Sequence, residues 1–199
     1  MPHIDYYFST ISPYTYIAGT RMEAVASAHG ATITYKPLDL VALFGRTGGV
    51  PPGQRHENRQ AWRLQELRRQ AAKAGVPINL KPAFWPTNAA PSCYAVIAAQ
   101  KAGGGDLGAL VQGFTRAVWA EERDISDDAV IRDVLGAHGF EAGLADSGLL
   151  SGAETYERNL DEAVAAGAFG APFYITDRDE RFWGQDSIND LALSLAGKL

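Results

Sequence analysis

The pattern of apolar and polar positions predicts a β-α-β unit at the start of the chain. Residues 4–8 are rich in aromatic and β-branched side chains, which is typical of a strand, and residues 31–36 alternate as a second strand. Between them, apolar residues recur at helical spacing from position 14 to 26. Ser12 stands before Pro13, and serine favours the cap of a helix while proline favours its first position, so this helix is expected to begin here.

The end of the chain shows a different order of elements. Residues 154–166 have the spacing of an amphipathic helix, and residues 173–176 and 181–183 are expected to form two strands joined by a tight turn. A closing helix is expected from about residue 186 to 196. The tail is therefore predicted to be α-β-β-α.

The middle of the chain is predicted to be helical. Its expected helices cover residues 55–74, 91–101, 107–120 and 128–135. The glycine- and proline-rich segment 45–53 is expected to be a loop, either a mobile surface loop or a lid over a site.

A β-α-β start, a helical middle and an α-β-β-α end are typical of an interrupted thioredoxin-like α/β fold. We expect residues 1–45 and 153–199 to form the thioredoxin-like domain, with one mixed sheet and helices on both faces. Residues 46–152 are then predicted to form an inserted all-helical domain.

Composition narrows the class of protein. The chain has 199 residues, of which 46% are hydrophobic and 21% charged, as in ordinary globular proteins. Its net charge of −5 argues against nucleic acid as a partner, and no apolar run is long enough to span a membrane. The start lacks a basic segment followed by an apolar run, so a cytoplasmic location is expected. The single cysteine, Cys93, excludes an internal disulfide and a zinc finger.

The segment Ser12-Pro13-Tyr14-Thr15 occupies the place where redox proteins of this fold carry Cys-X-X-Cys. Neither end of the segment is a cysteine, so dithiol–disulfide exchange is excluded. The Ser12 hydroxyl can instead donate a hydrogen bond to the thiolate of a ligand and keep it nucleophilic. The alternative is that Ser12 is a plain helix cap.

Two further motifs lie near the end of the chain. Ala171-Pro172 opens a strand, where an X-Pro bond is either cis, exposing the Ala171 backbone to an extended peptide, or an ordinary trans bond. Asp186 and Ser187 stand at a predicted helix N-terminus. They are either a helix cap or a site for an amino-acid end, with Asp186 binding the ammonium and Ser187 the carboxylate.

A run of basic residues marks the predicted helix at 55–74. Six arginine and lysine side chains stand there against two glutamates. The run is interpreted either as a solvated helix face or as a positive wall facing an anionic small molecule.

With these motifs together, the chain resembles 2-hydroxychromene-2-carboxylate isomerases, which are DsbA-like relatives of kappa-class glutathione transferases. The resemblance covers essentially the whole chain. It rests on Phe8 with Ser12-Pro13-Tyr14, on Gly75-Val76-Pro77, on Phe169-Gly170-Ala171-Pro172 and on Phe182-Trp183-Gly184-Gln185-Asp186.

The resemblance implies glutathione as cofactor. It implies that Ser12 contacts the glutathione sulfur and that Ala171, before a cis Pro172, pairs with the cysteinyl backbone. The segment Gln185-Asp186-Ser187 would hold the γ-glutamyl end, although the family favours Asp-Arg where this chain has Asp186-Ser187.

The resemblance also implies a substrate pocket and a reaction. Arg59, Trp85 and Asn88 are its candidate substrate-binding residues, with Arg59 pairing with a carboxylate and Trp85 forming an aromatic wall. The expected enzyme is a glutathione-dependent isomerase that acts on an unsaturated aromatic 2-oxo acid by reversible thiolate addition. It is expected to be a homodimer. The alternatives are a kappa-type transferase or peroxidase, and a non-catalytic module that binds a thiol or a peptide.

Overall fold

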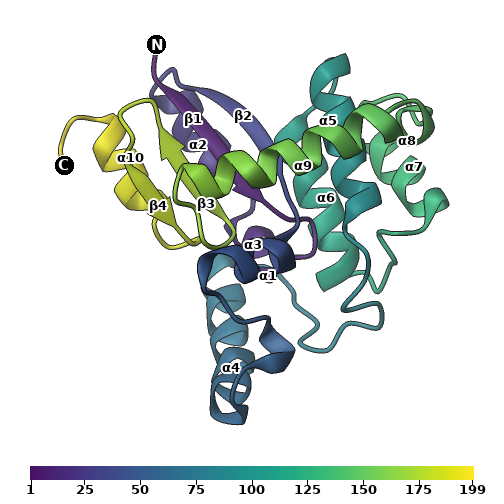
Figure 1. Ribbon diagram of the computed structural model, residues 1–199, viewed down its shortest axis with the longest axis horizontal. Coiled ribbons are helices and arrows are strands. Elements are labelled where there is room, and N and C mark those ends of the chain that lie inside the picture. The colour runs from purple at the N-terminus through teal and green to yellow at the C-terminus, as the bar shows by residue number, and fades with distance from the viewer.

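The computed structural model describes residues 1–199 and contains one four-stranded mixed sheet built from the two ends of the chain (Figure 1). Its strands are β1 (His3–Phe8), β2 (Thr32–Pro37), β3 (Phe173–Thr176) and β4 (Arg181–Trp183), in the spatial order β2-β1-β3-β4. β1 pairs with β2 in parallel, and β3 is antiparallel to both β1 and β4. The predicted pairing of a β-α-β start with a β-β end is therefore observed.

Helices make up most of the rest of the chain. They are α1 (Pro13–Ala18), α2 (Arg21–Ala28), α3 (Leu40–Thr47), α4 (Glu57–Ala74), α5 (Ala90–Ala102), α6 (Leu107–Trp119), α7 (Asp128–Ala137), α8 (Leu144–Ser147), α9 (Leu149–Ala165) and α10 (Ile188–Leu195), with one 3-10 turn, η1, at Pro52–Gln54. Figure 1 shows α5 to α8 grouped to one side of the sheet, α9 running from that group across the sheet, and α4 projecting from the body.

The first helix differs from its prediction because it is broken in two. The apolar spacing continues from residue 14 to 26, but Gly19 adopts φ 59° and ψ −142°, a conformation that favours glycine and ends α1. The chain then turns at Thr20 and starts α2 at Arg21. The short α1 keeps Ser12 at its N-terminus, directly after β1.

Three other helices, α3, α8 and α9, were not predicted as they stand. α3 covers residues 40–47 and so takes in the first residues of segment 45–53, which was expected to be a loop, and the Asp39 carboxylate caps it by accepting from the N–H groups of Val41 and Ala42. α9 begins at residue 149 rather than 154, so one continuous helix crosses the boundary expected between the inserted domain and the second thioredoxin-like segment. The division at residues 45/46 and 152/153 stays a prediction.

The core covers both faces of the sheet. On one face, Tyr6 stacks on Tyr174 with ring centroids 5.1 Å apart, and this cluster continues into α5 and α6. On the other face, Tyr7 and Phe173 pack with α3 and α9. Burial of these large side chains holds the two ends of the chain together and fixes the loop after β1.

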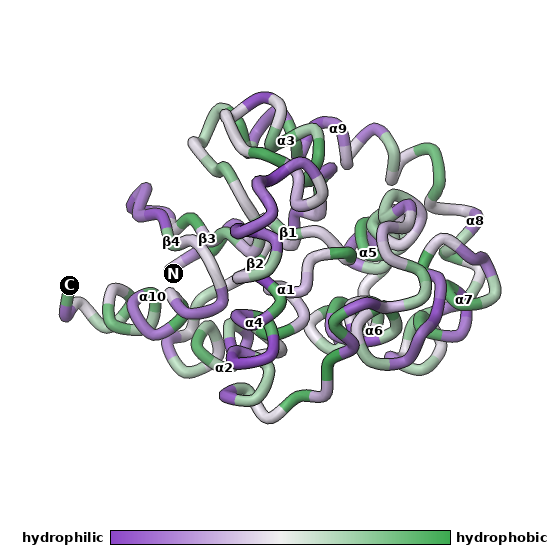
Figure 2. The backbone as a smooth tube through the Cα atoms, turned by 90° about the horizontal axis from the view of Figure 1, so that it is seen from below, coloured by the Kyte–Doolittle hydropathy of each residue, from purple (hydrophilic) through white to green (hydrophobic).

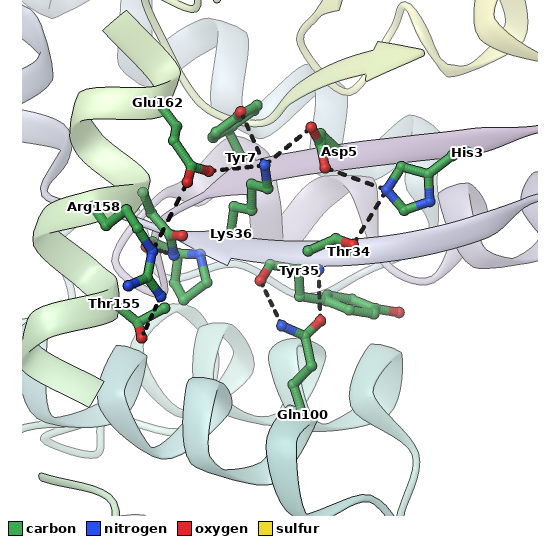
Figure 3. A network of polar contacts seen from close by, with 12 residues as sticks. His3, Asp5, Tyr7, Thr34, Tyr35, Lys36, Gln100, Thr155, Arg158 and Glu162 are labelled. Atoms are coloured by element: carbon green, nitrogen blue, oxygen red, sulfur yellow. Dashed lines mark hydrogen bonds and ion pairs between the residues drawn. The ribbon is translucent and has the colours of Figure 1, made fainter. Parts of the chain in front are cut away.

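A polar network ties the sheet to two helices of the middle and late chain (Figure 3). The ammonium of Lys36 on β2 lies 2.9 Å from Glu162 on α9 and 3.0 Å from Asp5 on β1. Gln100 on α5 accepts from the N–H of Tyr35 at 2.7 Å and donates to its carbonyl at 3.0 Å, which caps the outer edge of β2. The network therefore fixes α5 and α9 to the edge strand.

Candidate functional site

Ser12 lies in the loop between β1 and α1 and is 2% exposed. Its Oγ accepts a hydrogen bond from the Thr15 N–H at 3.3 Å, so Ser12 does cap the helix. The same hydroxyl donates to the Ala171 carbonyl at 3.3 Å, across 159 residues of sequence. The fold thus brings two predicted site residues into contact.

The Ala171-Pro172 peptide bond is cis. Ala171 is buried beside Ser12, and its N–H donates to no carbonyl of the chain. The Gly184 N–H donates to the Pro172 carbonyl at 2.9 Å, which ties the residues after β4 to the start of β3. An extended peptide placed against this segment would find an unpaired backbone N–H next to a hydroxyl.

The N-terminus of α10 carries the third predicted group. Asp186 is exposed and forms no ion pair, so its carboxylate is free to bind an ammonium. The Ser187 hydroxyl donates to the Trp183 carbonyl at 2.6 Å and does not cap α10, which leaves the first N–H groups of this helix without a side-chain acceptor. The buried Gln185 accepts from Arg21 at 2.9 Å through its backbone carbonyl, which fixes the segment against α2.

Helices of the middle chain hold the Ser12 loop in place. The Thr10 hydroxyl lies 2.8 Å from that of Ser92 on α5, and both residues are buried. The indole N–H of Trp119 on α6 donates to the Ile11 carbonyl at 3.1 Å. These bonds fix Thr10 and Ile11, the two residues before Ser12. Helices α5 and α6 therefore help to position the Ser12 hydroxyl.

The basic run forms α4, as predicted, and Figure 2 shows it as a largely hydrophilic stretch of backbone. Arg59 is exposed and forms no ion pair, which suits the predicted contact with an anion but does not test it. Arg63, one turn further along, is buried, with its guanidinium 5.3 Å from the centroid of the Trp85 ring. Sequence reasoning missed Arg63, because the charged run around it gives no sign of which arginine is covered.

Tyr14 is a second residue that sequence reasoning did not assign to the site. Burial raises the pKa of its phenol, the positive charge of Arg63 opposes this rise, and the carboxylate of Asp186 adds to it. Tyr14 is the second residue of α1, which packs against α4. The signal in the sequence was its position directly after Ser12-Pro13.

The two other candidate pocket residues both have structural roles. The Trp85 ring lies between Arg63 and Trp119, whose ring centroid is 5.7 Å away. Asn88 is exposed, and its side-chain oxygen accepts from the Ala90 N–H at 3.1 Å at the start of α5. Their contact with a substrate stays a prediction.

Cys93 is the only thiol of the chain and is buried on α5. Burial raises its pKa to about 11, and the Thr10 hydroxyl 3.4 Å away opposes the rise. A thiol in this state is a weak nucleophile. Any thiolate chemistry at Ser12 therefore needs a thiol from a ligand.

These observations can be set beside known proteins. A family model described as "DSBA-like thioredoxin domain" matches residues 3–196. The chain belongs to this family. The thioredoxin-like fold predicted from the order of elements is thereby confirmed.

Relatives of this DsbA-like chain include enzymes. It is 28% identical over 191 residues to a 2-hydroxychromene-2-carboxylate isomerase of Sphingobium xenophagum, covering 94% of this chain and 95% of the relative. It is 34% identical over 85 residues to "Glutathione S-transferase kappa 1" of Caenorhabditis elegans, covering 42% of this chain and 37% of the relative. The predicted resemblance to these two groups is confirmed.

A solved structure shows the same fold. The structure of a selenomethionine 2-hydroxychromene-2-carboxylate isomerase superimposes with a TM-score of 0.76 at 24% identity, covering 98% of this chain and 95% of that one. The DsbA-like chain also has no helix that combines the length and apolar character needed to cross a membrane.

Proposed function

We propose that this protein is a glutathione-dependent isomerase of an unsaturated aromatic 2-oxo acid of the 2-hydroxychromene-2-carboxylate type. The observation that carries the proposal is the contact between the Ser12 hydroxyl and the cis Ala171-Pro172 segment, in a chain whose own thiol is buried elsewhere. The similarity to named isomerases over almost the whole chain supports the same activity.

The residues at the site fit a thiol-containing tripeptide. The Ser12 hydroxyl would turn toward the cofactor sulfur, and the unpaired N–H of Ala171, held beside it by Pro172, would pair with the cysteinyl carbonyl. The free carboxylate of Asp186 would bind the γ-glutamyl ammonium, and the uncapped N–H groups of α10 the adjacent carboxylate. Gln185 and Ser187 would hold this segment in shape through the bonds that they already form.

Ser12 is the proposed catalytic residue. When bound, glutathione would supply a thiolate nucleophile for reversible conjugate addition to the carbon–carbon double bond of the acid. By donating a hydrogen bond to the sulfur, the Ser12 hydroxyl lowers the pKa of the thiol and raises the fraction present as thiolate. Arg59 and Trp85 would bind the acid from α4 and from the loop before α5, with Asn88 at the start of that helix.

A transferase of kappa type is the second candidate, because of the identity to the kappa transferase of Caenorhabditis elegans. The same site would then conjugate glutathione to an electrophile, or reduce a peroxide, without releasing the thiol unchanged. Detection of a stable conjugate without isomerised acid would favour this candidate.

The test is the interconversion of the cis and trans forms of a hydroxybenzylidene pyruvate, followed by absorbance, with reduced glutathione, with S-methylglutathione and without a thiol. The proposal expects turnover only with reduced glutathione, because the methylated form binds but has no free thiol. Equal turnover in all three reactions would contradict the proposal. The proposal includes a cytoplasmic homodimer, for which sedimentation of the purified chain tests the dimer.

A further inference from the structure

Arg63 is an unusual arginine in this chain, because it is buried without an anionic partner. It is 8% exposed, yet its guanidinium takes part in no ion pair and no hydrogen bond within the chain. Its nitrogens are not among the fully buried unpartnered polar atoms, so they retain contact with solvent. A guanidinium has five N–H donors, and withdrawing them from water without acceptors is unfavourable.

The nearest possible partner on the same helix is already engaged. The carboxylate of Glu66 lies 2.7 Å from Arg69 and accepts from Gln70 at 2.6 Å. Arg55 is close enough that its positive charge, in addition to burial, lowers the pKa of Arg63. Neither Arg55 nor Arg63 forms an ion pair, so positive charge is concentrated here.

Packing also fixes the orientation of the guanidinium. It lies over the Trp85 ring, with its Cζ 5.3 Å from the ring centroid, and Trp85 also packs against the fully buried Trp119, with ring centroids 5.7 Å apart. A planar guanidinium held against an aromatic ring keeps its edge free for a planar acceptor. The carboxylate group has the matching geometry, with two oxygens in one plane.

The position of Arg63 connects it to the candidate active site. Helix α4 packs against α1, the helix that Ser12 caps, and the charge of Arg63 acts on the buried phenol of Tyr14, the second residue of α1. We propose that Arg63 binds the carboxylate of the substrate and makes the enzyme selective for acids over their neutral analogues. This inference rests on the proposed function, and it names a buried residue for a role that the sequence suggested for the exposed Arg59.

The first test is direct binding, without turnover. Calorimetry would measure the affinity of benzoylformate, an aromatic 2-oxo acid, for the wild type, Arg63→Met and Arg68→Met. Methionine retains much of the packing over Trp85 but has no charge, and Arg68 is an exposed arginine of the same helix without a partner. We expect Arg63→Met to weaken binding about 10- to 100-fold, as expected when a charge-assisted hydrogen-bonded contact is lost, and Arg68→Met to leave it unchanged.

The second test separates the substrate carboxylate from the glycyl carboxylate of glutathione. In Arg63→Met, the KM for a hydroxybenzylidene pyruvate should rise by the same factor, while the KM for its neutral methyl ester and the Kd for glutathione stay at their wild-type values. Arg63→Lys keeps the charge without the planar group, and we expect it to recover part of the affinity. It also serves as the test variant if Arg63→Met does not fold.

Unchanged benzoylformate binding in Arg63→Met would overturn the inference, as would weakened glutathione binding with unchanged binding of the acid. Absence of benzoylformate binding to the wild type would also overturn it. If the wild type binds benzoylformate through Arg63 but isomerises nothing, the proposed isomerase fails while the carboxylate site stands.

Discussion

The thiol-facing region and the basic region of this site are built in opposite ways. Around Ser12, the Ala171 carbonyl and the Thr10 hydroxyl have partners within the chain, while the Ala171 N–H and the buried hydroxyls of Ser9 and Thr15 have none. Around α4, Arg59 and Arg63 form no ion pair, and the Arg63 guanidinium lies 5.3 Å from the centroid of the Trp85 ring. The region around Ser12 therefore presents polar groups in fixed positions, and the region around α4 presents positive charge.

The two regions would recognise the cofactor and the substrate in different ways. A region defined by backbone groups and buried hydroxyls suits a constant ligand, such as a peptide-like cofactor, because its geometry is set before binding. A region of uncompensated positive charge suits a variable ligand that needs only an acid group in the right place.

Ser12→Ala should have the largest effect. Removing the donor to the sulfur should lower kcat about 100-fold, since a preorganised donor at a reacting centre contributes on that scale. The variant also loses a helix cap, at a cost of about 1 kcal/mol in the free energy of unfolding. Steady-state kinetics and thermal unfolding measure the two effects.

Asp127→Ala is the matched control for Ser12→Ala. Asp127 caps α7 by accepting from the N–H groups of Ala129 and Val130, away from the site. It should lose similar stability and keep full activity. An equal loss of kcat in the two variants would show that Ser12 acts only through folding.

Asp186→Ala should weaken glutathione about 10- to 100-fold, because an ammonium would lose its charged hydrogen-bond acceptor. Calorimetric titration measures this. The control is Asp190→Ala, which removes an exposed carboxylate one turn further along α10. Equal affinity of Asp186→Ala and the wild type would remove the γ-glutamyl site from the account.

Thr10→Val tests whether the helical part of the chain positions Ser12. It removes the buried bond to Ser92, which keeps its other bond to the Ala89 carbonyl at 2.9 Å. We expect a loss of about 1–2 kcal/mol in the free energy of unfolding. If the loop is positioned from α5, kcat should fall several-fold while the Kd for glutathione changes little, and an unaffected kcat would argue against this coupling.

Cys93 should show the smallest effect of all. Because burial raises its pKa to about 11, iodoacetamide should leave the native protein unmodified near neutral pH and react only in denaturant. Mass spectrometry of the treated protein measures this. Rapid labelling of the native protein would show that Cys93 is reactive, and it would contradict the claim that the thiolate must come from a ligand.

Much of the fold was predictable because its strands carry strong local signals. The strands ending at Phe8 and Thr176 are aromatic and β-branched, and their predicted positions agree with β1 and β3. The break between α1 and α2 was not predictable from spacing, because the apolar period continues through Gly19 and only its positive φ ends the helix. α3 was missed because a short apolar run fits a strand, a helix or a loop equally well.

Some residues of the candidate site were predictable from the sequence, and others were not. Ser12, Ala171 and Asp186 stand at the junctions of strands and helices, so motif and topology together pointed to them. Arg63 belongs to the site through a contact with a residue distant in sequence, because the Trp85 ring covers its guanidinium. Periodicity within α4 reports which face is apolar, and it gives no signal for an arginine whose cover comes from another segment.

The most direct test of the central claim is the titration of bound glutathione by the ultraviolet absorbance of its thiolate. The account predicts a pKa below that of free glutathione in the wild type, and a return toward the free value in Ser12→Ala. An identical pKa for the bound and free thiol would contradict the role of Ser12, even if glutathione binds.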